Sequence, residues 1–142
     1  MRALNGEITQ FVCGYARAGL RFDEDLVMMG PHDEYTIAEA LRHTMIRHDP
    51  ATALVTGNNR ITVLVLRAFA DRAERPALVG FDDFELADLL NPQVSVVAHD
   101  TAALGRAAAE LLFARLTGDN SPPHRVTLPV HLIARGSGEK AP

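Results

Sequence analysis

The sequence predicts an α/β fold in which helices cover both faces of a parallel sheet. Residues 53–56, 77–81 and 94–97 are short, continuous apolar runs, which are typical of strands buried on both faces. Segments with helical spacing of apolar residues alternate with these runs through most of the chain. Alternating buried strands and helices indicate a parallel sheet, and ligands of such sheets bind beyond the carboxyl ends of the strands.

The N-terminal part of the chain is predicted to contain a helix and a strand. From Ile8, apolar residues recur at the i, i+3, i+4 and i+7 positions, which indicates a helix over residues 8–18. Gly19 is placed to end that helix in the left-handed conformation. Residues 26–29 form an apolar run closed by a Gly-Pro pair, and this predicts a buried strand.

Two helices are predicted on either side of the strand at residues 53–56. Thr36 and Glu39 have the spacing of a capping box, and Pro50 follows the end of the helix that they begin. Asn59 is expected to cap the next helix, over residues 60–72. That helix is apolar nearly all round, so it is either buried on more than one side within the domain or part of a subunit interface.

The C-terminal part is predicted to contain a long helix, an edge strand and a tail. Asp100 caps the helix, which runs to Leu116. Its apolar residues at core spacing are Leu104, Ala108, Leu111 and Leu112. Residues 126–134 are strand-like, but Pro129 places this strand at a sheet edge or a crossing point. Residues 136–142 are expected to be a frayed tail.

Composition excludes several classes of protein. The 142 residues are 47% hydrophobic and 23% charged, as in ordinary globular domains. A net charge of −4 argues against a nucleic-acid-binding surface on this chain. Cys13 is the one cysteine, which excludes an internal disulfide and fits a reducing compartment. No apolar run approaches the roughly 20 residues of a membrane span, and no secretory signal is recognised, so a cytoplasmic protein is expected.

The sequence offers little support for catalysis, metal binding or a cofactor. Asp82 and Asp83 are adjacent on an extended chain, so their side chains point to opposite sides and would not face one substrate bond. There is no Gly-x-Ser-x-Gly elbow and no phosphate-cradling glycine loop. His43 and His48 are five residues apart on a helix, which places them on different faces. We therefore expect no enzyme, no cofactor and no metal.

Binding of a small polar molecule suits the residues at the strand ends better. Asp82 follows one predicted strand and Asn58 follows another. Carboxylate and amide groups can exchange paired hydrogen bonds with neighbouring hydroxyls. The alternative for both residues is a local role in a turn or helix cap. Asp83 is expected to face away from the ligand and to hold the loop.

Several segments match a known family in their order and spacing. They are Thr52-Ala53-Leu54-Val55, Gly57-Asn58-Asn59, Val79-Gly80-Phe81-Asp82-Asp83, Asn91-Pro92-Gln93-Val94-Ser95-Val96-Val97, Leu104-Gly105-Arg106 and Val126-Thr127-Leu128-Pro129. Together they resemble the LacI/GalR family of bacterial transcriptional regulators. The resemblance covers about residues 11–135 and depends on the whole series of segments.

The resemblance implies a type I periplasmic-binding-protein-like domain, in which two α/β subdomains clamp a small effector. This chain would supply mainly the C-terminal subdomain, as residues 1–97 without the first strand. Residues 98–135 would form a crossing segment whose helix and closing strands belong partly to the N-terminal subdomain. Residues 136–142 would be a disordered tail. The sheet would then be incomplete, and the helix that ends at Leu116 would lack its partner. Its apolar stripe would then be exposed or buried in an improvised contact.

The resemblance also implies a site and partners. Asp82 would bond to effector hydroxyls, Asn58 would lie in the same pocket, and His99 would line the cleft from the crossing segment. The expected partners are a sugar-like effector, a second copy of the chain, and operator DNA through a helix-turn-helix outside this chain. No membrane partner is expected. Two alternative functions stay open: a periplasmic-type sugar-binding protein of a transporter, and an α/β enzyme of flavodoxin-like layout.

Overall fold

The computed structural model describes residues 14–30, 33–72 and 74–139. The chain divides into two compact units, the first ending at Pro31 and the second beginning at His32. The expected boundary between residues 97 and 98 stays a prediction. The strand near the C-terminus joins the same sheet as the earlier strands, so the sheet of the second unit includes residues from both sides of that boundary.

In the first unit, the short stretch of residues 14–17 is helical. Gly19 follows with a φ of 70°, as expected for a residue that ends a helix. The rest of the predicted helix, residues 8–13, lies outside the described residues.

The strand predicted over residues 26–29 is wrong. Leu26 instead closes a short 3₁₀ helix, η1 (Glu24–Leu26), and Met29 is 65% exposed. Asp23 begins η1 by accepting a hydrogen bond from the Asp25 N–H. An apolar run becomes a strand only beside another strand, and the described residues of this unit offer none.

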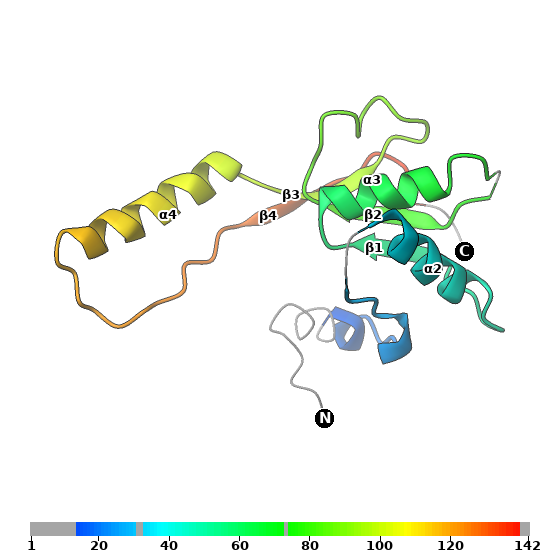
Figure 1. Cartoon of the computed structure of the whole chain (residues 1–142), viewed down its shortest axis with the longest axis horizontal. Helices are drawn as coiled ribbons and strands as arrows, with labels where there is room; N and C mark the ends of the chain where they lie inside the picture. The colour runs from blue at the N-terminus through cyan, green and yellow to red at the C-terminus, as the bar shows by residue number, and fades with distance from the viewer. Residues whose placement is uncertain (1–13, 31–32, 73, 140–142) are drawn as a thin grey trace. The chain divides into compact units, whose positions relative to one another are not determined.

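The second unit is built on a four-stranded sheet in the order β1-β2-β3-β4 (Figure 1). The strands are β1 (Ala53–Thr56), β2 (Ala77–Phe81), β3 (Ser95–His99) and β4 (Val130–Ile133). The first three are parallel, as predicted, and β4 runs antiparallel to β3 at the edge. Pro129 precedes β4, where its missing N–H costs the sheet no hydrogen bond.

Two helices cover one face of this sheet, namely α2 (Glu34–Met45) and α3 (Asn59–Ala68) (Figure 1). The buried core beneath them consists of Val65, Phe69, Leu78, Ala87, Val94, Val96 and Ala98. α3 contacts α2 as well as β1 and β2. It is therefore buried on more than one side within the domain, which explains why it is apolar nearly all round.

The opposite face of the sheet has no helix over it among the described residues of this unit. Side chains alternate between faces along a strand, and this face carries Val55, Val130 and Leu132, which are 57%, 53% and 62% exposed. The sequence predicts helices on both faces of the sheet. Among the described residues, helices cover only one face. The incomplete sheet is consistent with the expected partial domain.

The helix caps differ from the predicted ones by a few residues. Asp33 caps α2, because its carboxylate accepts hydrogen bonds from the Thr36 N–H and hydroxyl at 2.8 and 2.9 Å. The predicted capping box is wrong: Glu39 instead pairs with Arg42. A cap is the last residue with an extended backbone, and Asp33 occupies that place three residues before Thr36.

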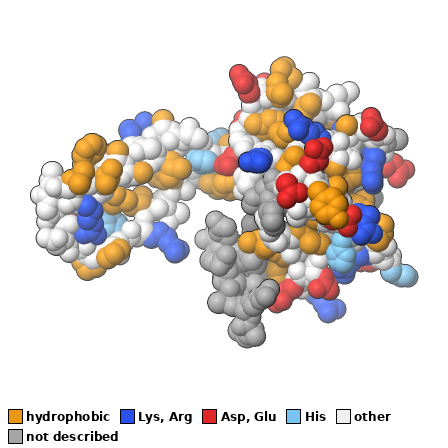
Figure 2. Space-filling view, in the orientation of Figure 1, with side chains coloured by type: hydrophobic (Ala, Val, Ile, Leu, Met, Phe, Trp, Pro, Cys, Tyr) orange, Lys and Arg blue, Asp and Glu red, His pale blue; other side chains and the backbone are white. Residues whose placement is uncertain are grey.

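The fourth helix, α4 (Thr101–Leu116), begins as predicted with Asp100 as its cap. It stands away from the sheet, and hydrophobic side chains lie over its surface (Figures 1 and 2). No residue of α4 is buried, and Leu104 and Leu112 are 50% and 57% exposed. The core contacts predicted from its spacing are absent within the described residues, and its apolar stripe is exposed, which is one of the two outcomes that the resemblance implied.

The predicted disordered tail is wrong for residues 136–139. Ser137 is buried, and its hydroxyl donates to the Leu78 carbonyl at 2.6 Å and accepts from the Ser95 N–H at 2.8 Å. The Glu139 carboxylate accepts a hydrogen bond from the Ser95 hydroxyl at 3.1 Å. This segment therefore ties β2 to β3 through polar groups, which no hydrophobic pattern signals. Residues 140–142 lie outside the described residues.

Candidate functional site

The three predicted site residues lie at one edge of the sheet. The parallel register pairs Thr56 of β1 with Gly80 of β2, and Phe81 of β2 with Val97 of β3. Asn58 and Asp82 follow β1 and β2, and His99 ends β3. Because the carboxyl ends of parallel strands meet at the same edge, the topology gathers the three residues there.

Asp82 has the most unusual environment of these residues. Its φ is 67°, in the left-handed region that few residues other than glycine, asparagine and aspartate adopt. Its N–H donates to the Val97 carbonyl at 3.0 Å, so its backbone is held against β3. Its Oδ1 atom is buried and has no hydrogen-bond partner within the described residues.

His99 lies beside this carboxylate. Its Nδ1 atom is 3.2 Å from Asp82 Oδ1, which is charge-pair distance, although the geometry of a hydrogen bond is not met. The imidazole also stacks on Phe81, with ring centroids 6.1 Å apart and planes at 24°. The sequence predicted both site residues, but neither their contact nor the role of Phe81. The strand register could have predicted the ring stack, because Phe81 and His99 lie on the same face of neighbouring strands.

Asn58 serves the local structure with one half of its side chain. Its Oδ1 accepts a hydrogen bond from the Ile61 N–H at 2.9 Å and caps α3, the role that the sequence assigned to Asn59. Its backbone carbonyl accepts from both the N–H and the hydroxyl of Thr62. Within the described part of the chain, no hydrogen bond from the Asn58 amide nitrogen is found. A cap and a ligand contact are therefore compatible at this residue.

Asp83 holds the loop after β2, as the sequence predicted. Its carboxylate accepts two hydrogen bonds from the Arg135 guanidinium, both at 2.7 Å. Arg135 also donates to the Val94 carbonyl at 3.2 Å. Hydrogen bonding from Arg135 holds the pKa of Asp83 below its ordinary value, against a smaller opposing effect of burial. Arg135 lies 52 residues away in sequence, so no local pattern marked it as the partner.

The ion pair between Asp83 and Arg135 predicts that the fold loses stability at acidic pH. Because the pKa of Asp83 is lowered on folding, the stabilisation is complete above its ordinary value of 3.8 and is lost as the pH falls through the lower folded value. We expect the difference in urea midpoint between the wild type and Arg135→Leu to shrink below about pH 4. Solvent reaches Asp83, which keeps the effect modest.

The matched control for this measurement is Arg125→Leu, which removes an exposed arginine from the loop before β4. Its urea midpoint should follow that of the wild type at every pH. A difference between Arg135→Leu and the wild type that stayed constant from pH 7 to pH 3 would show that the pair makes no pH-linked contribution.

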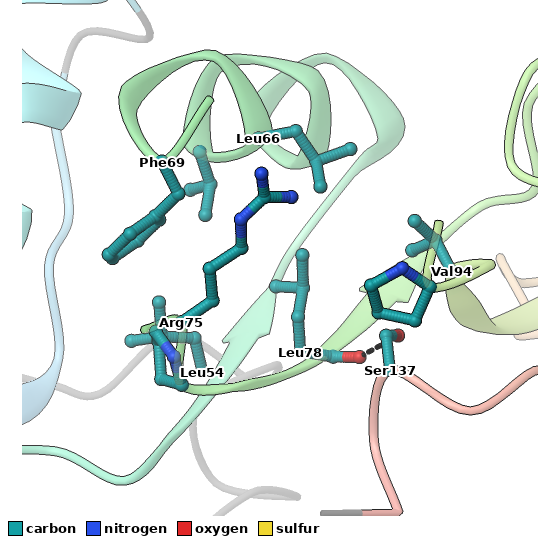
Figure 3. Close-up of a pocket in the computed structure, with 10 residues that line it drawn as sticks. Leu54, Leu66, Phe69, Arg75, Leu78, Val94 and Ser137 are labelled. Atoms are coloured by element: carbon teal, nitrogen blue, oxygen red, sulfur yellow. Dashed lines mark hydrogen bonds between the residues drawn. The ribbon is translucent and has the colours of Figure 1, made fainter. Parts of the chain in front are cut away.

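A cavity in this unit lies at the other end of the sheet (Figure 3). It is lined by Leu54, Leu78, Val94 and Ser137 near the amino ends of the strands, with the Arg75 side chain lying across it. Its volume of about 30 Å³ has room for a water molecule or two and not for a sugar. The cavity is therefore a packing feature and is separate from the candidate site.

The strand-end residues supply both acceptors and donors of hydrogen bonds. A carboxylate oxygen accepts hydrogen bonds, an amide nitrogen donates them, and the imidazole can do either. No group of three or more histidine, cysteine, aspartate or glutamate side chains could hold a metal ion within the described residues. Among the helices of the described part, none is both long and apolar enough to span a membrane.

Comparison with known proteins identifies the family. Residues 8–138 match the periplasmic binding protein-like domain family. The transcriptional regulator CelR of Thermobifida fusca is 34% identical over 125 residues, which are 85% of this chain and 37% of that protein. The lactose operon repressor of Rhizobium radiobacter is 32% identical over 110 residues, which are 75% of this chain and 94% of that sequence.

A solved complex of CelR with cellobiose has the same fold. It superimposes with a TM-score of 0.78 at 29% identity, covering 92% of this chain and 41% of that one. The chain thus spans about two fifths of the length of these CelR proteins. The family match covers nearly the whole chain, and the relatives are repressors and regulators of the LacI type. The chain therefore belongs to the periplasmic binding protein-like domain family, in the form found in LacI-type transcriptional regulators.

Proposed function

We propose that this chain is the effector-sensing part of a cytoplasmic LacI-type transcriptional regulator and has no enzymatic activity. Its effector is a sugar or related polyol, bound at the sheet edge by Asp82, Asn58 and His99. The regulator forms a homodimer and contacts operator DNA through a part of the protein outside these residues. The names of the relatives favour this function over a sugar-binding protein of a transporter.

The observation that carries the proposal is the pairing of Asp82 and His99. Their side chains are only 31% and 19% exposed, and they approach to 3.2 Å at the carboxyl edge of a parallel sheet. Asp82 also holds a left-handed backbone conformation, which is uncommon and gathers at ligand-binding positions. A partly buried carboxylate beside an aromatic stack supports recognition of a neutral molecule that presents hydroxyl groups.

The position of the site suggests how a ligand would act. His99 ends β3, and the next residue, Asp100, caps α4. A ligand held at the end of β3 therefore lies next to the point where the chain leaves the sheet for α4. A ligand can change operator binding only if it binds one relative arrangement of the two subdomains more tightly than the other. The subdomain to which α4 belongs stays a prediction.

Asp82→Ala is expected to abolish the response to effector in the native-length regulator and to leave operator binding intact. Loss of the carboxylate leaves ligand hydroxyls without an acceptor, which costs about 1–3 kcal/mol of affinity, or roughly 5- to 150-fold. The measurement is calorimetric titration with cellobiose and lactose, together with operator binding with and without the sugar.

The control is Asp71→Ala, which removes an exposed carboxylate that follows α3 and is not one of the strand-end residues. It should bind sugar and operator as the wild type does. An Asp82→Ala variant with unchanged sugar affinity would remove Asp82 from the site. A wild type that binds neither sugar would count against both disaccharides as effectors.

A further inference from the structure

We propose that His99 is a positioning residue, which holds the Asp82 carboxylate in place so that one oxygen faces His99 and the other faces the ligand. This inference rests on the proposed function, since it concerns the same site. It assigns to His99 a role that acts through Asp82 and does not require His99 to touch the ligand.

The backbone of Asp82 is already fixed by the sheet. Its N–H is bonded to the Val97 carbonyl of β3 at 3.0 Å, and its φ of 67° turns the chain sharply at the end of β2. The next residue, Asp83, is anchored on both oxygens by Arg135. The remaining freedom of Asp82 is therefore rotation of its side chain.

The side chain of Asp82 has one oxygen that needs a partner. Oδ1 is buried, and among the described residues it accepts no hydrogen bond. A buried carboxylate oxygen without a donor is unfavourable, because it has lost its water and gained nothing in exchange. His99 Nδ1, at 3.2 Å, is close enough for a small rotation of the imidazole to supply that donor.

The position of His99 is set by the sheet. It pairs with Val130 at the end of the β3–β4 ladder, and its ring stacks on Phe81 of β2. The neighbouring Asp100 carboxylate caps α4 and lies 3.8 Å from Arg106, and His99 also acts on it electrostatically. His99 is thus a restrained ring whose Nδ1 lies 3.2 Å from a carboxylate with a fixed backbone.

The consequence is a preference for neutral ligands with a hydroxyl donor. If His99 donates to Oδ1 after that rotation, Oδ2 is the oxygen left for the ligand, and it accepts a hydrogen bond in a defined direction. A ligand carboxylate or phosphate would meet the like charge of Asp82. If His99 were lost, the carboxylate would rotate freely, and ordering it on binding would weaken the affinity.

The test reads the Asp82 carboxylate directly and needs no ligand. In the chain labelled with carbon-13, the Cγ signal of Asp82 is identified by its disappearance in Asp82→Asn. At constant pH, His99→Leu should shift this signal, and His99→Gln should restore it, since glutamine keeps a side-chain N–H donor. His131→Gln is the matched control, because His131 lies opposite Ala98, on the other face of the sheet. It should leave the signal unchanged.

Two results would overturn the proposal. Either His99→Leu leaves the Cγ signal of Asp82 where the wild type has it, or His99→Gln shifts the signal as far as leucine does. A second readout is titration with cellobiose, where we expect affinity to fall about tenfold in His99→Leu and to stay within about threefold in His99→Gln. A wild type that binds no cellobiose would count against that sugar as effector, while the Cγ signal still decides the role of His99.

Discussion

Ser137→Ala is expected to lower the free energy of unfolding by about 2–4 kcal/mol, because it leaves two buried backbone groups without partners. The Ser137 hydroxyl is the acceptor for the Ser95 N–H and the donor to the Leu78 carbonyl. These groups belong to the starts of β3 and β2, so the loss should loosen the centre of the sheet. Urea denaturation followed by circular dichroism measures the change.

Ser121→Ala is the matched control for this substitution. Ser121 lies in the exposed loop after α4, where its hydroxyl bonds only to the Asp119 side chain. Its removal should change the free energy of unfolding by less than about 0.5 kcal/mol. If Ser137→Ala were equally mild, the C-terminal segment would not be a structural part of the sheet, and its expected role as a loose tail would return.

Gly80→Ala is expected to destabilise the fold by about 1–3 kcal/mol through overpacking. A Cβ atom at Gly80 would lie 2.8 Å from Thr62 Oγ1 and 3.3 Å from Thr62 Cγ2. Thr62 is fully buried, and its hydroxyl is held by the Thr56 hydroxyl and the Asn58 carbonyl. The threonine has no free space into which to move, so β2 and α3 must separate instead.

Gly105→Ala is the matched control, and it should act in the opposite direction. Gly105 lies within α4, where an added Cβ meets nothing within 4 Å. Alanine favours a helix over glycine by about 0.5–1 kcal/mol, so the helical circular dichroism signal should rise slightly. A Gly80→Ala variant as stable as the wild type would show that β2 and α3 adjust to the extra atom without cost.

The sequence predicted the elements whose patterns are local. The bounds of β1 and β2 agree with the predicted runs, because a short apolar run between turn residues has few alternatives. The alternation of these strands with helices was enough to predict the parallel pairing of β1, β2 and β3. The caps of α2 and α3 were placed less accurately, since several neighbouring polar residues could serve and only the path of the chain selects one.

The sequence failed where a residue depends on a distant partner. Residues 26–29 carry a strand-like pattern but have no neighbouring strand among the described residues of their unit. The segment around Ser137 has a tail-like composition, yet its hydroxyl fits two backbone groups more than 40 residues away. α4 has core spacing but no described core to enter. Hydrophobic periodicity shows which side chains of a segment could be buried. It does not show whether another part of the fold is there to cover them.

By itself, the sequence placed Asp82 and Asn58 at the carboxyl edge of a parallel sheet, because strand order and polarity are enough to predict that position. The family resemblance added His99 to the same cleft. The tertiary structure alone decided how these residues meet. It brought the His99 imidazole to 3.2 Å from an aspartate oxygen, stacked it on Phe81, and fixed Asp83 on Arg135. Contacts of this kind depend on register, sheet twist and a left-handed turn, which are set by many residues at once, and no local pattern in the chain encodes them.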